Sequence, residues 1–194
     1  MGSNSNIELK NTLLSLFYES NKLFLEEDID NIKSGVSERN LCALLACKIN
    51  GFLSQYGLTE YHADVEYNRN GGKIKTIIND ELKVIPITCD LILHSRGHKQ
   101  KDNLLAIEMK KIPCEVEELN KDRNRLIALT KHEFGDMFSY DGNTFPKNVC
   151  DYEIGIFYLL DVPHRRITLE IYDNGKIINK ETKSFLYYMN YSDN

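Results

Sequence analysis

Apolar residues near the N-terminus recur at the three- and four-residue spacing of amphipathic helices. The first such stretch covers residues 7–27 and ends in an acidic segment. The second begins after Ser37, a residue typical of a helix N-cap, and carries Glu38 in its first turn, where a negative charge favours the positive end of a helix. Its buried stripe would comprise Leu41, Leu44, Leu45, Ile49 and Phe52. The pattern therefore predicts two helices, the second ending by Gly57.

Beyond residue 60 the apolar pattern changes to one typical of β-strands, with turn signals at Asn70-Gly71-Gly72 and Asp173-Asn174-Gly175. A polar helix is predicted over residues 115–130, and a loop rich in Gly, Pro and Asn over residues 135–148. The predicted strands cover residues 61–69, 73–78, 84–94, 103–111, 153–160, 166–172 and 176–178.

This order of elements predicts a single α/β domain over residues 1–194, with a central mixed sheet flanked by helices. Within this domain, the first two helices would occupy residues 7–56. The catalytic core would occupy residues 61–130, and further strands would occupy residues 151–180. A chain of 194 residues that is 42% hydrophobic is long enough and apolar enough to bury one core.

Charged residues interrupt two of the apolar strands, and such residues are costly there unless they are paired or bind a cation. Asp90 lies in the predicted strand 84–94, and Glu108 and Lys110 lie two residues apart in the strand 103–111, so they project from the same face. In an antiparallel hairpin with Asp90 opposite Glu108, residue 94 would face 104 and the polar segment 97–101 would form the turn.

Two carboxylates on adjacent strands form a hard oxygen site suited to Mg²⁺ or Mn²⁺. A neighbouring lysine supplies a cation that positions a water or stabilises an oxyanion on a phosphate. The alternative is that Glu108 and Lys110 are half-exposed strand residues without a further role. Glu38 likewise has two interpretations: it lies near the apolar stripe of its helix and could reach the metal site, or it serves only as the acid of a helix start.

The pattern of Asp90, 17 intervening residues and Glu108-Met109-Lys110 resembles the PD-(D/E)XK nuclease superfamily, with Glu38 in an upstream helix. The stretch Leu91-Ile-Leu-His-Ser-Arg-Gly97 is similar to small stand-alone bacterial members. The resemblance covers about residues 38–130, roughly half of the chain, and Cys89 departs from the motif because it stands where proline would be.

This resemblance implies a restriction-endonuclease-like fold and a role for each matched residue. Asp90, Glu108 and the backbone carbonyl of Met109 would bind Mg²⁺ or Mn²⁺, Lys110 would orient the attacking water, and Glu38 would assist in placing the metal or the water.

The net charge of −5 argues against a wholly basic nucleic-acid binder, but the charge is unevenly distributed. Residues 73–111 hold eight Lys and Arg against five Asp and Glu, whereas residues 1–66 hold five basic and ten acidic residues. Such a local excess suits a polyanionic substrate, although a solvated basic face explains it too. His94 would either contact substrate or cap the end of its strand. The candidate substrate contacts are Lys73, Lys75, His94, Arg96, Lys111, Arg123 and Arg125.

The function predicted from these observations is a divalent-metal-dependent nuclease that hydrolyses phosphodiester bonds, with DNA as the substrate by resemblance. One alternative is an inactive nuclease-like module that binds nucleic acid or protein, and another is a small-molecule phosphoesterase. No appended DNA-binding module is evident, so we expect low sequence specificity, specificity for structure or ends, or a partner protein that supplies targeting; a homodimer is compatible with the sequence.

Five cysteines without a CxxC pair predict reduced thiols rather than a disulfide scaffold or a zinc ribbon. The chain has no apolar run of the roughly 20 residues that a membrane span needs, and its first residues lack the apolar stretch of a signal peptide. We therefore expect a soluble cytoplasmic protein that does not associate with membranes.

Overall fold

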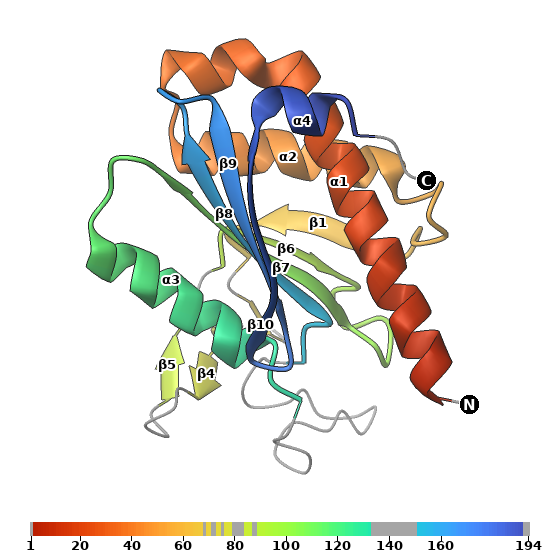
Figure 1. Cartoon of the computed structure of the whole chain (residues 1–194). Helices are drawn as coiled ribbons and strands as arrows, with labels where there is room; N and C mark the ends of the chain where they lie inside the picture. Colours follow the sequence, from red (N-terminus) through yellow and green to blue (C-terminus); the bar gives the residue numbers. More distant parts are fainter. Residues whose placement is uncertain are drawn as a thin grey trace.

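The computed structural model describes residues 2–67, 69–70, 73–74, 76–78, 84–86, 89–132 and 151–191 (Figure 1). The helices are α1 (Gly2–Ser34), α2 (Glu38–Phe52), α3 (Val116–Leu129) and α4 (Phe185–Met189). The strands are β1 (His62–Val65), β2 (Arg69–Asn70), β3 (Lys73–Ile74), β4 (Thr76–Ile78), β5 (Val84–Pro86), β6 (Leu91–His94), β7 (Asn103–Lys111), β8 (Ile154–Asp161), β9 (Arg166–Asp173) and β10 (Lys176–Ser184).

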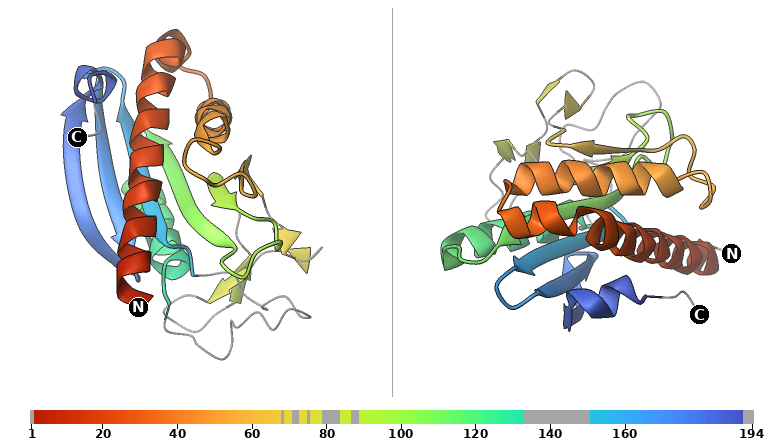
Figure 2. Two further views of the ribbon diagram at one scale, coloured as in Figure 1. Left: turned by 90° about the vertical axis from the view of Figure 1, so that its right-hand side faces the viewer. Right: turned by 90° about the horizontal axis from the view of Figure 1, so that it is seen from above.

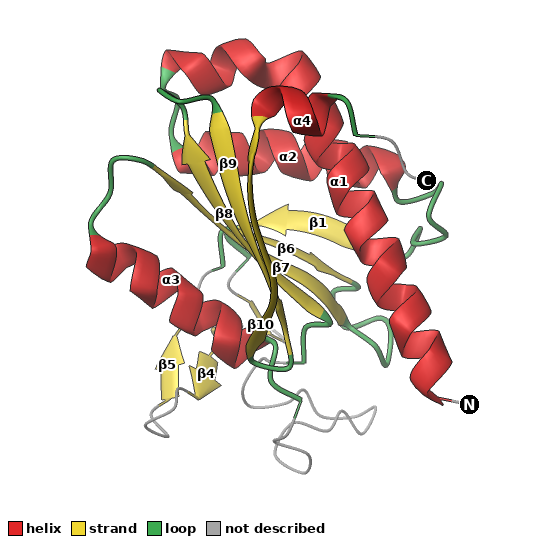
Figure 3. Cartoon of the chain, in the orientation of Figure 1, coloured by secondary structure: helices red, strands yellow, loops and turns green. Residues whose placement is uncertain are grey.

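Six strands form the main sheet in the order β1-β6-β7-β8-β9-β10. All neighbouring pairs are antiparallel except β7 and β8, which are parallel. A parallel pair needs a crossover connection, and α3 lies within it. The predicted α/β architecture, with a mixed sheet flanked by helices, is confirmed (Figure 3).

The two faces of the sheet carry separate apolar clusters, because alternate residues of a strand point to opposite faces. Leu105, Ile107 and Met109 of β7 belong to the larger cluster with α1 and α2. Ala106 belongs to the smaller cluster, which contains Leu126 of α3. Figure 2 shows α1 running alongside the strands with α2 and α4 beside it. Strand β7 is therefore covered on both faces, and Glu108 within it is fully buried.

Several local predictions are confirmed. The side chain of Ser37 accepts a hydrogen bond from the Asn40 N–H at 3.2 Å and caps α2, and the polar helix α3 forms at its predicted position. Asn174 and Gly175 adopt positive φ angles of 45° and 71° and join β9 to β10 in a two-residue hairpin. Helix α1 is longer than expected, α2 ends at Phe52 before the turns that lead to Gly57, and β10 continues to Ser184.

The prediction of one continuous strand over residues 84–94 is wrong. Residues 84–86 form β5, which pairs with β4 in a separate two-stranded sheet, and β6 starts only at Leu91. Pro86 has no backbone N–H to donate to a neighbouring strand, and a proline is therefore better tolerated at the end of a strand than in its interior. The predicted strand 73–78 is divided in the same way between β3 and β4, and the predicted loop 135–148 lies outside the described residues.

Candidate functional site

Asp90 and Glu108 are brought together by the pairing of β6 with β7. The register Leu91↔Ile107, continued by one residue, places Asp90 opposite Glu108, as the hairpin prediction required. The N–H of Met109 donates to Oδ2 of Asp90 at 2.9 Å and fixes that carboxylate beside β7. The expectation that residue 94 faces 104 is wrong, because a bulge shifts the register and pairs His94 with Asn103.

The alternation along β7 places Glu108 and Lys110 on the face covered by α3 and Met109 on the opposite face. Sγ of Cys42 in α2 lies 3.9 Å from Sδ of Met109, whereas Glu108 and Lys110 form ion pairs with residues of α3. The side chain of Glu108 is fully buried. The prediction that Glu108 and Lys110 share a face is confirmed, and the alternative of a half-exposed Glu108 is wrong.

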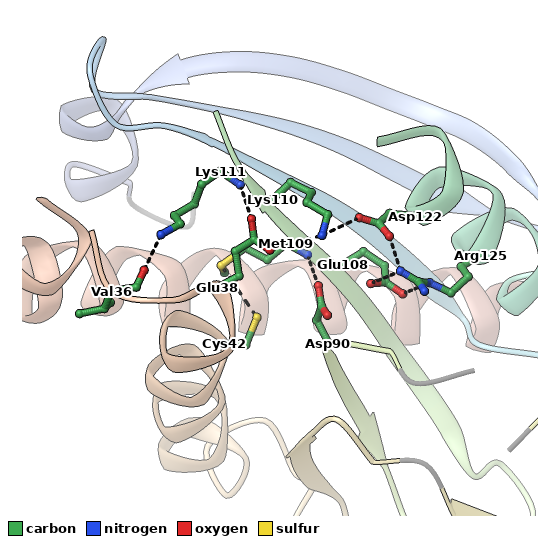
Figure 4. A network of polar contacts seen from close by, with 10 residues as sticks. All are labelled: Val36, Glu38, Cys42, Asp90, Glu108, Met109, Lys110, Lys111, Asp122 and Arg125. Atoms are coloured by element: carbon green, nitrogen blue, oxygen red, sulfur yellow. Dashed lines mark hydrogen bonds and ion pairs between the residues drawn. The ribbon is translucent and has the colours of Figure 1, made fainter. Parts of the chain in front are cut away.

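Helix α3 contributes two charged residues that complete the network in Figure 4. The guanidinium of Arg125 donates from Nε to Oε1 of Glu108 at 2.9 Å and from Nη2 to Oε2 at 3.3 Å. The same Nη2 contacts Oδ1 of Asp122, whose other oxygen, Oδ2, lies 3.4 Å from Nζ of Lys110. Asp122 therefore connects the lysine of the site with the arginine that holds Glu108.

Glu38, at the start of α2, reaches the same network around the end of β7. Its Oε2 lies 3.3 Å from Nζ of Lys110, and its Oε1 accepts the backbone N–H of Lys111 at 2.9 Å. The amino group of Lys111 points away from the network and donates to the carbonyl of Val36. The structure thus brings Glu38, Asp90, Glu108 and Lys110 together, whereas Lys111 fastens β7 to the segment before α2.

Burial controls the protonation of the carboxyl groups in this network. It raises the pKa of Glu108 well above the usual range, and the negative charge of Asp90 adds to this shift while Arg125 opposes it. Burial likewise raises the pKa of Asp90, against the stabilising N–H of Met109, and raises that of Asp122 against Arg125 and Lys110. Burial therefore disfavours the charged form of each of these carboxyl groups, and Arg125, Lys110 and the N–H of Met109 oppose that effect.

Lys110 shows the opposite balance. Burial lowers the pKa of its amino group, but the carboxylates of Asp122 and Glu38 outweigh burial and raise that pKa above its ordinary value. At neutral pH the side chain is accordingly a fixed ammonium cation rather than a base.

Asp122 was not among the residues predicted from the sequence, although the sequence of α3 contains a pattern that indicates its burial. Residues 119, 122, 126 and 129 follow the spacing of one helix face, and the other three are leucines. An acid in the middle of such a stripe becomes buried, and the side chain of Asp122 is only 4% exposed. Its Oδ2 is buried and has Lys110 as its ion-pair partner.

Most of the predicted substrate contacts bond with groups of the protein itself. His94 is buried and its Nε2 lies 3.0 Å from Oδ2 of Asp64, so its ring bonds within the protein, and a contact of His94 with substrate stays a prediction. Arg96, on the hairpin after β6, donates two hydrogen bonds to the same Asp64 at 2.8 and 2.6 Å. These residues stabilise the edge formed by β1 and β6.

Arg123 and Arg125, which were expected to extend a basic surface, each pair with a buried carboxylate instead. Arg123 donates to both oxygens of Glu170 at 2.8 and 2.9 Å, and Arg125 holds Glu108. The side chain of Lys73 and the whole of Lys75 lie outside the described residues.

The donor set of this network suits a hard divalent cation in charge and in chemistry. Four carboxyl groups, from Glu38, Asp90, Glu108 and Asp122, meet two cationic groups, from Lys110 and Arg125, so the fully ionised network has two uncompensated negative charges. Oxygen ligands and an excess of two negative charges match Mg²⁺ or Mn²⁺. Within the described part of the chain, no three acidic, histidine or cysteine side chains already converge on a common cation position.

The chain matches no protein-family model, and no curated protein and no solved structure is significantly similar to it. Among the described helices, none has the length and apolar composition that crossing a membrane requires.

Proposed function

We propose that the protein is a divalent-metal-dependent nuclease that hydrolyses phosphodiester bonds in DNA, on a restriction-endonuclease-like fold. The observation that carries this proposal is the meeting of Asp90, Glu108, Lys110 and Glu38 at one end of the pair β6–β7. Glu108 and Lys110 follow Asp90 by 18 and 20 residues in the sequence. Together these two carboxylates and the lysine supply the residue types that phosphodiester hydrolysis uses. The mixed sheet flanked by helices supports the proposed fold.

In this proposal Asp90, Glu108 and the backbone carbonyl of Met109 hold Mg²⁺ or Mn²⁺. When bound, such an ion polarises a phosphate oxygen and lowers the pKa of a coordinated water. Asp90 suits this role because the N–H of Met109 fixes one of its oxygens and its carboxyl group interacts directly with that of Glu108.

Lys110 acts as a charged positioning group in the proposed mechanism. Its raised pKa keeps the amino group protonated, so it donates hydrogen bonds to the attacking water or to the phosphate and offsets developing negative charge. Glu38 and Asp122 hold the ammonium from two sides, at 3.3 and 3.4 Å. This double contact limits the orientations that Lys110 can adopt, which is what a positioning role requires.

A second candidate function is an inactive module that binds nucleic acid or protein. The observation in its favour is that both oxygens of Glu108 are already bonded to Arg125 and that one oxygen of Asp90 is bonded to Met109. Such a paired network can serve stability alone. A cleavage assay distinguishes the two functions, because an inactive module would bind DNA without cleaving it in the presence of metal.

The decisive experiment is a cleavage assay on supercoiled plasmid and single-stranded DNA with Mg²⁺, Mn²⁺ or EDTA. The variants are Asp90→Asn and Lys110→Ala, with Asp30→Asn, an exposed acid of α1, as the matched control. Circular dichroism melts confirm that each variant is folded. We expect metal-dependent cleavage in the wild type and the control and a loss of at least about a hundredfold in the other two variants. Equal cleavage by all four proteins, or no cleavage at all, would contradict the proposal.

We also propose a reducing compartment, the cytoplasm, as the location. Cys42, Cys47, Cys89 and Cys114 have free thiols, and two of them are buried against the sheet, which supports this proposal.

A further inference from the structure

Arg125 occupies the place beside Glu108 that a bound cation would take. Glu108 is fully buried, and an ionised carboxylate in that position requires a counter-charge. The guanidinium supplies it with two parallel hydrogen bonds, at 2.9 and 3.3 Å, one to each carboxylate oxygen. A divalent ion that binds Glu108 must therefore share or replace this arginine.

The surroundings of Arg125 allow it to leave Glu108 without losing every partner. Its side chain is 29% exposed, whereas that of Glu108 is fully buried, so the arginine is the member of the pair with room to move. Its Nη2 also contacts Asp122, which lies three residues earlier on the same helix, and that contact does not depend on Glu108. Asp122 can accordingly retain the guanidinium within the network.

The charge balance of the network favours such an exchange. When the carboxyl groups of Glu38, Asp90, Glu108 and Asp122 are all ionised, they outweigh Lys110 and Arg125 by two negative charges, and one divalent ion then neutralises the network with both cationic residues still present. Two cations on the same carboxylate repel each other, so the arginine and the ion compete for the oxygens of Glu108.

We propose that Arg125 is a displaceable counter-ion: a divalent ion replaces it at Glu108, and the released guanidinium, retained by Asp122, binds a phosphate of the nucleic-acid substrate. This inference rests on the proposed function, because it requires the metal site at Asp90 and Glu108. Guanidinium groups suit this second role because their planar donors match phosphate oxygens.

Arg123 is a matched control for Arg125. It lies on the same helix and makes the same two-bond contact, at 2.8 and 2.9 Å, with Glu170, another buried carboxylate. Glu170 has further partners in Lys180 and Tyr172 and is not part of the network around Glu108. The two arginines therefore share the two-bond contact with a buried carboxylate and differ in which carboxylate they neutralise.

The experiment measures Mn²⁺ binding to the full chain from the loss of the free-Mn²⁺ signal in electron paramagnetic resonance. The proteins are the wild type, Arg125→Gln, Arg123→Gln and Asp90→Asn. We expect Arg125→Gln to bind Mn²⁺ about tenfold more tightly than the wild type, the effect of one positive charge removed at roughly 6 Å with water-like screening. Arg123→Gln should bind like the wild type, and Asp90→Asn should bind weakly. In the presence of Ca²⁺, Arg125→Gln should also bind a DNA oligonucleotide several-fold more weakly than Arg123→Gln.

The outcomes separate this inference from the proposed function. Mn²⁺ binding that depends on Asp90 but is unchanged or weakened in Arg125→Gln would overturn the inference and leave the metal site intact. Binding that is absent, or indifferent to Asp90→Asn, would overturn both. If Arg125→Gln does not fold, Arg125→Lys replaces it: this variant keeps the charge but loses the paired geometry, and we expect Mn²⁺ binding tighter than that of the wild type. An affinity of Arg125→Lys equal to or below the wild-type value overturns the inference.

Discussion

Asp122 of α3 holds Lys110 of β7 across the face of the sheet, with 3.4 Å between Oδ2 and Nζ. The contact joins a helix and a strand that the crossover from β7 to β8 places against each other. Asp122 also contacts Arg125, the partner of Glu108, so a single carboxylate orients both cationic groups of the site. Its position makes Asp122 the central residue of the network, although it belongs to no motif in the sequence.

Replacement of Asp122 by asparagine should reduce catalysis more than substrate binding. The variant keeps the shape of the side chain but removes the charge that raises the pKa of Lys110 and holds its amino group. We expect kcat of DNA cleavage to fall by about tenfold to a hundredfold with a smaller change in KM, and the NMR-measured pKa of Lys110 to fall. Glu117→Gln, an exposed acid in the first turn of α3, is the control. A change in KM alone would contradict a positioning role for Asp122.

Replacement of Arg125 by alanine should destabilise the metal-free protein by about 3 kcal/mol, because it leaves the buried carboxylate of Glu108 without its counter-charge. Arg123→Ala should cost less, since Lys180 and Tyr172 remain bonded to Glu170. Urea unfolding at neutral pH in EDTA measures both differences. An equal or smaller loss for Arg125→Ala would show that Glu108 does not depend on this arginine.

Glu170 should make the stability of the protein sensitive to acid. Burial opposes its ionisation, but hydrogen bonds from Arg123, Lys180 and Tyr172 lower its pKa to about 2, from an ordinary value of 4.5. A carboxylate with a lowered folded-state pKa stabilises the fold above pH 4.5, and this contribution is lost as the pH falls from 4.5 towards 2. The contribution amounts to roughly 3 kcal/mol.

The measurement for Glu170 is the free energy of unfolding in urea at a series of pH values between 7 and 2.5. The wild type should lose stability more steeply below pH 4.5 than Glu170→Gln, which cannot take up a proton at this position. Parallel pH profiles for the two proteins would show that the carboxylate is not specifically stabilised in the folded state.

His94 should contribute to stability and not to substrate affinity. Its ring is buried, bonds to Asp64 and lies against the ring of Tyr67, with 4.5 Å between the ring centroids. We expect His94→Ala to lower the free energy of unfolding by about 1–3 kcal/mol, because Asp64 loses a partner and a cavity forms. DNA affinity, measured with the folded variant below its melting temperature, should be unchanged. A specific loss of DNA binding without loss of stability would restore the original expectation for this residue.

Features that depend only on neighbouring residues could be predicted from the sequence. Ser37 and Glu38 start a helix because a cap and a first-turn acid act within four residues, and Asn174-Gly175 forms a tight turn because both residues tolerate positive φ. The pairing of Asp90 with Glu108 could also be predicted, because placing the two charged residues opposite each other leaves a polar, glycine-containing segment for the turn, although the bulge at His94 could not.

Which charged residues meet, and which are removed from solvent, depends on how the elements pack against one another. Arg123 and Arg125 have the same chemistry and lie two residues apart, yet Arg123 pairs with Glu170 of β9 and Arg125 with Glu108 of β7. The position of α3 against the sheet determines these partners. The interruption of the strand 84–94 and the burial of His94 likewise depend on contacts with distant segments. Spacing along the chain specifies the face of an element on which a residue lies, but only the packing of that face specifies what it touches.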